Sequence, residues 1–236
     1  MKMTEEATSP LYDLWAKFYD YTFGALVRKR QVRALQQLRP AAGETVLDIG
    51  VGTGMTLRHY PRNITVVGMD LSQGMLAKAR NKVRREGLDH CVLIQGDAMT
   101  PPFADHSFDH VMITHVVSVV SDPQKLMQWA RRMVKPGGRI VVLNHFLSPN
   151  PFLAWWEKVL NPMFVKIGWR SDLALEDCLK DTGLSVQYNF KMSRVDLWQI
   201  VVLGEEGVKP ARPVQPAPVP ADDGPAGKSH AALAIE

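Results

Sequence analysis

The sequence predicts an α/β fold in which helices cover both faces of a mostly parallel sheet. Between residues 45 and 144, short apolar runs that suit buried parallel strands alternate with segments of helical periodicity. The first run, 45–49, leads directly into three glycines at the spacing Gly50-x-Gly52-x-Gly54. Such glycines let the backbone turn sharply and let a ligand lie against bare main chain. Because ligands of these sheets bind outside the carboxyl ends of the strands, we expect the functional site at that edge.

The individual elements follow from apolar runs, caps and turn residues. Strands are expected at 45–49, 64–69, 91–95, 109–114 and 139–144, and then at 185–192 and 195–203. One helix should follow Gly54, and another should run from the N-cap Ser72 to Arg85, where Gly87 ends it. Pro123 opens a further helix, and 173–182 is helical as well. The run Pro136-Gly137-Gly138 predicts a turn before the strand at 139–144.

Composition sets limits on the class of protein. The length of 236 residues suits one α/β domain with additions, and 46% hydrophobic content is ordinary for a globular protein. The sequence has no apolar run that could span a bilayer, and the polar, acidic residues 1–9 are not a secretory signal. Two cysteines make no disulfide framework, and we expect no metal. The net charge of +4 permits an anionic partner, but no module typical of RNA-binding proteins is evident, so no nucleic-acid partner is expected.

Three regions flank or interrupt the alternation. Residues 1–40 are predicted to form two helices, 11–23 and 25–38, of which the second carries Arg28, Lys29, Arg30 and Arg33. That basic run is either a solvated helix face or a surface for an anionic partner. Within the main domain, 41–207, the apolar insert 146–173 is either a helical cap or a substrate pocket. The tail 208–236 is rich in proline and alanine and is predicted to be disordered.

Polar side chains stand where the predicted strands end. Asp70 ends the second strand, 20 positions after Gly50, and Asp97 follows the third strand. His115 and His145 follow the fourth and fifth strands. A nicotinamide-binding domain also places an acid about 20 residues beyond its first glycine. That fingerprint requires G-x-G-x-x-G, however, and here the third glycine comes one residue early, while position 55 is Met.

The segment from Val46 to Gly54, with Asp48 inside the strand, resembles the V-L-D-x-G-x-G-T-G motif of the class I S-adenosylmethionine (SAM) methyltransferases. The resemblance implies that family's fold, a mostly parallel seven-stranded sheet, and SAM as cofactor. It also implies that Asp70 binds the ribose hydroxyls and that Asp97 binds the adenine amino group. The full set of cofactor-binding residues expected from it is Tyr12, Asp48, Gly50, Gly52, Gly54, Asp70, Leu71, Met75, Asp97, Ala98 and Thr114.

Three further stretches are similar to the bacterial phospholipid N-methyltransferases: residues 12–20, 115–123 and Asn144-His145-Phe146. That family converts phosphatidylethanolamine to phosphatidylcholine by successive methylations. Related quinone C-methyltransferases share the opening Tyr-Asp pattern but commonly carry a His pair where this chain has Ser118 and Val119. The resemblance therefore implies a phospholipid substrate, an anionic membrane surface as partner, and a monomeric protein in the cytoplasm, attached peripherally to the inner membrane. Residues 1–40 would then serve as lid and membrane contact.

Methylation of an amine requires a proton acceptor, because an ethanolamine amine is protonated near pH 7. His145 is the first candidate for this role, Tyr19 the second, as positioner or relay, and His115 the third. Each histidine could instead be a structural residue at a strand end. Two alternatives to phospholipid methylation stay open, namely methylation of a quinone or another lipid-like molecule, and a SAM- or lipid-binding module without catalysis.

Overall fold

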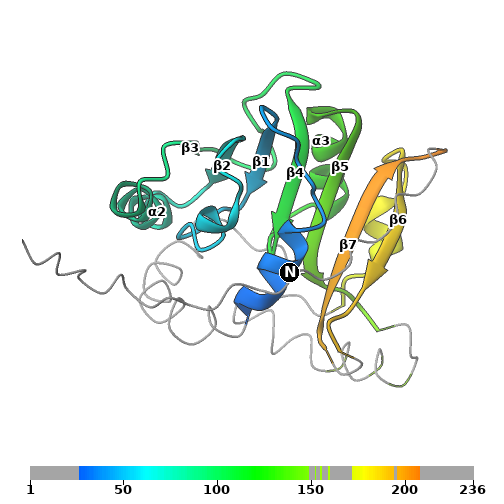
Figure 1. Ribbon diagram of the computed structural model, residues 1–236. Helices are drawn as coiled ribbons and strands as arrows, with labels where there is room; N and C mark the ends of the chain where they lie inside the picture. The colour runs from blue at the N-terminus through cyan, green and yellow to red at the C-terminus, as the bar shows by residue number, and fades with distance from the viewer. Residues whose placement is uncertain are drawn as a thin grey trace, which may run out of the picture.

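The computed structural model describes residues 27–148, 172–193 and 196–207, together with Phe152, Trp155 and Val159. The predicted helix 11–23, with Tyr12 and Tyr19, lies outside these residues, as do most of the insert and the tail 208–236. The described chain forms one seven-stranded sheet in the order β3-β2-β1-β4-β5-β7-β6, which runs from left to right in Figure 1. This arrangement confirms the predicted mostly parallel sheet.

The strands lie close to their predicted positions. They are β1 (Thr45–Ile49), β2 (Thr65–Asp70), β3 (Cys91–Gln95), β4 (Phe108–Thr114), β5 (Val134–His145), β6 (Leu184–Phe190) and β7 (Trp198–Glu205). β1 pairs in parallel with β2 on one side and with β4 on the other, and among the described strands β7 alone runs opposite to the common direction, antiparallel to both β5 and β6. The carboxyl ends of β1 to β5 therefore meet at one edge of the sheet, which we call the carboxyl edge. The start of β7 joins it there, because His145 pairs with Trp198.

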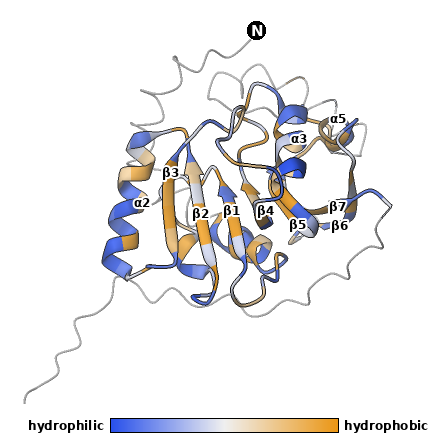
Figure 2. Ribbon diagram, turned by 90° about the horizontal axis from the view of Figure 1, so that it is seen from above, coloured by the Kyte–Doolittle hydropathy of each residue, from blue (hydrophilic) through white to orange (hydrophobic). Residues whose placement is uncertain are grey.

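Helices cover both faces of the sheet, as predicted. On one face, α3 (Pro123–Met133) and α5 (Leu175–Leu179) pack on side chains of β1, β4, β5 and β7 (Figure 2). On the other face, residues 27–35 are helical and pack with Ala34 and Leu35 on the opposite side chains of the same strands. α2 (Gln73–Glu86) contributes Leu76 to this second core, near β2 and β3. Alternate strand residues thus point into two separate apolar cores.

Capping residues fix the ends of the two long helices. Ser72 accepts a hydrogen bond from the Met75 amide at the start of α2, and Gly87 ends that helix in the left-handed conformation, with φ of 58°. Asp122 accepts a hydrogen bond from the Lys125 amide at the start of α3, where Pro123 occupies the first turn. These caps lie where the sequence predicted helix ends.

Three local predictions differ from the structure. The segment after Gly54 forms only a short 3-10 helix, Leu57–His59, because Thr56 and Tyr60 on either side of it turn their side chains back onto Asp48. The helix predicted at 173–182 is shorter, Leu175–Leu179. Pro136-Gly137-Gly138 is not a turn between elements. It forms an irregularity inside β5, since Val134 pairs with Phe108 and the next pair is Arg139 with His110.

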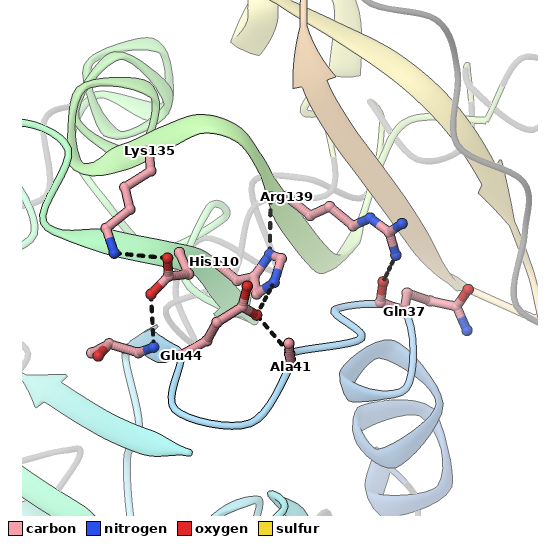
Figure 3. Close-up of polar contacts among 8 residues, drawn as sticks. Gln37, Ala41, Glu44, His110, Lys135 and Arg139 are labelled. Atoms are coloured by element: carbon pink, nitrogen blue, oxygen red, sulfur yellow. Dashed lines mark hydrogen bonds and ion pairs between the residues drawn. The ribbon is translucent and has the colours of Figure 1, made fainter. Parts of the chain in front are cut away.

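A polar network fixes the amino edge of the sheet, opposite the carboxyl edge (Figure 3). Asp109 accepts hydrogen bonds from the Thr45 amide at 2.9 Å and from the Lys135 ammonium at 2.7 Å. The Nδ1 atom of His110 accepts a bond from the Arg139 amide, so its Nε2–H is directed at the Glu44 carboxylate, 3.1 Å away. Burial lowers the pKa of His110, which favours this neutral form. The network joins β1, β4 and β5 at the ends remote from the glycine turn.

The basic run in the N-terminal region requires a correction. Arg30 forms an ion pair with Asp196, and the guanidinium of Arg33 lies 5.6 Å from the ring centre of Phe190, so both side chains face the sheet. Lys29 is exposed, and Arg28 is half-buried. The four cations therefore do not form one exposed cluster, because the helix that carries them packs on the sheet and directs two of them toward it.

Candidate functional site

The turn after β1 is shaped by left-handed glycines. Gly50, Gly52 and Gly54 have φ of 73°, 55° and 74°, a region that side-chain-bearing residues rarely adopt. A Cβ atom on Gly50 would lie 2.1 Å from the side chain of Val116, so the loop after β4 passes directly against this turn. The amides of Gly50 and Val51 both donate to the Met69 carbonyl, at 2.8 and 3.1 Å. The turn is thereby tied to the end of β2.

Asp70 holds this turn from the end of β2. One carboxylate oxygen accepts the Gly52 amide at 2.8 Å, and the other accepts the Ser72 amide at 2.9 Å. Burial raises the pKa of Asp70, and these two amide bonds act in the opposite direction. Each oxygen of a carboxylate can accept more than one hydrogen bond, so Asp70 retains acceptor capacity for hydroxyl groups of a ligand. That capacity fits the ribose-binding role expected from the sequence.

Asp48 is a carboxyl group enclosed within the sheet. Its side chain is fully buried, and one oxygen accepts hydrogen bonds from the hydroxyls of Thr56 at 3.1 Å and Tyr60 at 3.0 Å. The other oxygen, Oδ1, has no hydrogen-bond partner among the described residues. Burial raises the pKa of Asp48 to about 7. A carboxylate in such a place would be stabilised by a nearby cation.

The other predicted cofactor residues lie on neighbouring parts of the same edge. Asp97 follows β3, and its Oδ1 atom accepts the Met99 amide at 2.8 Å, with Ala98 half-buried beside it. Leu71, directly after β2, is 53% exposed, whereas Met75 is buried in the first turn of α2. Thr114 is the buried last residue of β4. The structure thus brings the strand-end residues together, and Tyr12 lies outside the described part of the chain.

His115 follows β4 in a left-handed conformation, with φ of 60°, which is uncommon for a residue with a side chain. Its amide donates to the Leu143 carbonyl, and its ring meets that of Trp198 edge-on, with centres 6.2 Å apart. Burial lowers the pKa of His115 to about 4, and the charge of Arg30 contributes in the same direction. A histidine of such low basicity is a poor proton acceptor near pH 7.

His145 is the last residue of β5 and is 3% exposed. Its Nδ1 atom lies 2.7 Å from the Leu197 carbonyl oxygen. A carbonyl only accepts, so Nδ1 carries a proton, and the nitrogen left to accept a proton is Nε2. Of the two predicted histidines, His145 has the geometry that suits a proton acceptor better.

Sequence reasoning missed the residues around the start of β7. The Leu197 carbonyl contacts His145 and the Trp198 ring contacts His115, and Arg30 binds the neighbouring Asp196 across 166 positions of sequence. The polar Asp196 side chain is almost fully buried. The only available signal was an acid directly before an apolar strand, and that pattern is too common to mark a site.

The comparisons with known proteins agree with this edge being a cofactor site. A protein family described as a methyltransferase domain matches residues 47–142. The phosphatidylethanolamine N-methyltransferase of Cereibacter sphaeroides is 38% identical over 192 residues, covering 81% of this chain and 94% of that protein. The demethylmenaquinone methyltransferase of Listeria welshimeri is 31% identical over 163 residues, covering 67% of this chain and 66% of that protein. A SAM-dependent methyltransferase structure from Aquifex aeolicus, 18% identical, has a TM-score of 0.59 and covers 81% of this chain and 97% of that one, which bears on the fold.

The residues present fit SAM, which is cationic at its sulfonium and ammonium groups. The glycine turn offers bare backbone, since a Cβ atom on Gly52 would meet nothing closer than 3.9 Å. Asp70 supplies hydroxyl acceptors, and Asp97 supplies a further carboxylate at the end of β3. The unsatisfied Oδ1 atom of Asp48 is a buried acceptor that a cationic ligand would stabilise.

Replacing Asp70 with Ala should weaken SAM binding by about 1–3 kcal/mol, because ligand hydroxyls lose their acceptor and the Gly52 amide loses its anchor. Isothermal titration calorimetry measures this loss directly. The matched control is Asp89→Ala, which removes an exposed carboxylate at the amino edge and should leave affinity unchanged. Equal affinity of the folded Asp70→Ala protein and the wild type would remove Asp70 from the site.

Replacing Asp48 with Asn should change how stability depends on pH. The folded-state pKa of Asp48 lies above its unfolded value, so the folded protein prefers the protonated acid and loses stability as pH rises from about 4 to 7. Asn does not titrate, so the free energy of unfolding of the variant relative to that of wild type should rise by about 2–3 kcal/mol from pH 5 to pH 8. Urea unfolding at both pH values measures this difference. The control Asp105→Asn, at a half-exposed carboxylate, should show no such gain. Parallel pH profiles of stability for wild type and Asp48→Asn would contradict the raised pKa of Asp48.

Proposed function

We propose that this chain, which belongs to the class I SAM-dependent methyltransferases, methylates the amine of phosphatidylethanolamine and of its mono- and dimethyl derivatives to give phosphatidylcholine. The observation that carries most weight is the 38% identity to a phosphatidylethanolamine N-methyltransferase, because it extends over 94% of that protein. The three stretches that resemble phospholipid N-methyltransferases support the same substrate class. The geometry of His145 supports it further, since this reaction needs a proton acceptor.

SAM supplies an electrophilic methyl group on its sulfonium. The chain's own residues bind and orient the two reactants. The glycine turn, Asp70 and Asp97 hold the cofactor at the ends of β1 to β3, while the substrate amine must lose its proton and then lie in line with the methyl carbon. The Nε2 atom of His145 accepts that proton, directly or through water. Tyr19 stays a prediction as positioner or relay, because it lies outside the described residues.

Methylation of a quinone is the second candidate, supported by 31% identity to demethylmenaquinone methyltransferases. The sequence after β4 argues against it, because quinone enzymes commonly carry a His pair where this chain has Ser118 and Val119. Ser118 is buried, and its hydroxyl donates to the side chain of Asn144 at 3.3 Å, next to His145. It therefore supports the strand end and supplies no proton acceptor.

A lipid substrate implies that the protein works at a bilayer surface, which we propose to be the cytoplasmic face of the inner membrane. None of the described helices is both long and apolar enough to cross a membrane. At the carboxyl edge, Leu71 and Met192 follow β2 and β6 and Leu197 precedes β7, and all three are 44–53% exposed. The insert after β5 adds Phe152, Trp155 and Val159, which are 49–67% exposed, and we call these six side chains the apolar rim. This apolar rim would face the lipid, and exposed Lys29 would contribute about 1 kcal/mol near anionic headgroups. The protein is proposed to act as a monomer.

Expression of this chain in a bacterium that lacks phosphatidylcholine should produce mono-, di- and trimethylated phosphatidylethanolamine, measured by lipid mass spectrometry. His145→Ala should lower turnover by about 10²–10⁴ while SAM affinity stays close to wild type. As a control, His90→Ala changes a histidine between α2 and β3, at the amino edge, and should leave turnover unchanged.

Two outcomes would contradict this proposal. Methylated quinone without methylated phospholipid would favour the second candidate. Turnover of His145→Ala within a few-fold of wild type would leave His145 as a structural residue.

Binding to vesicles tests the apolar rim. The double variant Phe152→Ser/Trp155→Ser should lose most of its co-sedimentation with vesicles that contain anionic phospholipid, because two exposed apolar side chains no longer enter the interface. The control is Val92→Ser, which removes an exposed apolar side chain from the edge strand β3. Raising the salt concentration should weaken wild-type binding. Equal sedimentation of wild type and double variant would rule out the rim as the membrane contact.

A further inference from the structure

The tripeptide Asp196-Leu197-Trp198 contacts both histidines at the carboxyl edge. The Leu197 carbonyl lies 2.7 Å from His145 Nδ1, and the Trp198 ring packs edge-on against the ring of His115. Trp198 also pairs with His145 across β7 and β5. The position of this short segment therefore determines how both rings lie.

Arg30 clamps the tripeptide from the N-terminal helix. Its Nε atom lies 2.9 Å from each oxygen of Asp196, whose side chain is 1% exposed, while the guanidinium lies 4.8 Å from the centre of the Trp198 ring. Asp196 also accepts the Trp198 amide at 3.1 Å. A buried carboxylate with a charged partner and a backbone donor is strongly held in place.

Leu197 itself does little to fix its own carbonyl. Its side chain is 51% exposed, so packing of that side chain does not set the backbone. The residues on either side do so, Asp196 through Arg30 and Trp198 through its pairing with His145. The acceptor that sets the His145 tautomer is thus held by a charge pair on one side and by strand pairing on the other, rather than by packing of the Leu197 side chain.

We propose that Arg30 and Asp196 are positioning residues that, through the Leu197 carbonyl, keep the proton of His145 on Nδ1, so that Nε2 is the ring nitrogen that accepts a proton. Groups that orient a functional histidine in this way fix which ring nitrogen carries the proton. The expected effect on kcat rests on the proposed methylation. The tautomer of His145 does not rest on it, because the tautomer can be measured in the protein without substrate.

Asp196→Asn tests the inference, since Asn keeps the size of the side chain and an acceptor for the Trp198 amide but removes the charge that holds Arg30. Long-range ¹H–¹⁵N NMR spectra of the protein without ligands should show His145 protonated on Nδ1 in wild type and a mixture of tautomers in the variant. With phosphatidylethanolamine vesicles, kcat should fall by about 10-fold to 100-fold, a loss of the size that removing an orienting group causes. KM for lipid and the affinity for SAM should stay within about twofold, because neither residue belongs to the expected cofactor set and the Asp196 side chain is buried against Arg30.

Two further variants separate positioning from folding. Arg30→Lys keeps the charge and should retain the Nδ1–H tautomer with an intermediate kcat, which also provides a test if Asp196→Asn does not fold. Asp105→Asn breaks an ion pair with Arg132 that spans 2.8 Å between half-exposed side chains, and it should change neither the spectrum nor kcat.

An unchanged His145 tautomer in folded Asp196→Asn would overturn the inference. So would a kcat equal to that of wild type, even with a changed tautomer. If the wild-type protein methylates no phosphatidylethanolamine, the proposed function fails, and the NMR result alone then decides whether Arg30 and Asp196 position the ring.

Discussion

The contact between the turn after β1 and the loop after β4 is the constraint on which the carboxyl edge depends. Val116 lies so close to Gly50 that a side chain there would overlap it, and the positive φ of Gly50 directs two successive amides at the Met69 carbonyl. The carboxylate of Asp70 then accepts a hydrogen bond from the Gly52 amide. One steric requirement thus joins the ends of β1, β2 and β4, and it leaves bare backbone facing the place where strand order reverses.

Asp48 and Asp70 show how environment separates two carboxyl groups of the same type. Asp70 accepts two backbone amides, which favour its charged form and offset part of its burial. Among the described residues, Asp48 has only hydroxyl donors, both on one oxygen, so burial dominates and its pKa rises to about 7. The second carboxyl is therefore suited to hydroxyl groups, and the first responds most to the arrival of positive charge.

The sequence predicted the strands and the strand-end acids well, because buried parallel strands are apolar runs and caps such as Ser72 and Asp122 are local. It failed where distant partners decide. Pro136-Gly137-Gly138 is locally a turn, yet pairing with β4 keeps it within β5. Arg30 and Arg33 belong to a run that suggests either a solvated face or a surface for an anionic partner, but their partners Asp196 and Phe190 follow about 160 positions later in the chain. The contacts of His145 with Leu197 and Trp198 could likewise be found only from the fold.

The N-terminal helix is bonded at both edges of the sheet. Arg30 holds it to Asp196 at the carboxyl edge. Near the amino edge, the carbonyl of Gln37 accepts a hydrogen bond from Arg139 (Figure 3), and the Gln37 side chain accepts one from Tyr188. Residues 27–38 therefore pack as part of the domain. They belong to the segment 1–40 that the sequence predicts as a lid, and they are bonded to β5, β6 and the start of β7. Moving this helix would break the Arg30–Asp196 pair and release the carbonyl that orients His145. Under the proposed mechanism, the substrate would therefore have to reach His145 without displacing this helix, since displacement would release the ring that the proposal makes the proton acceptor.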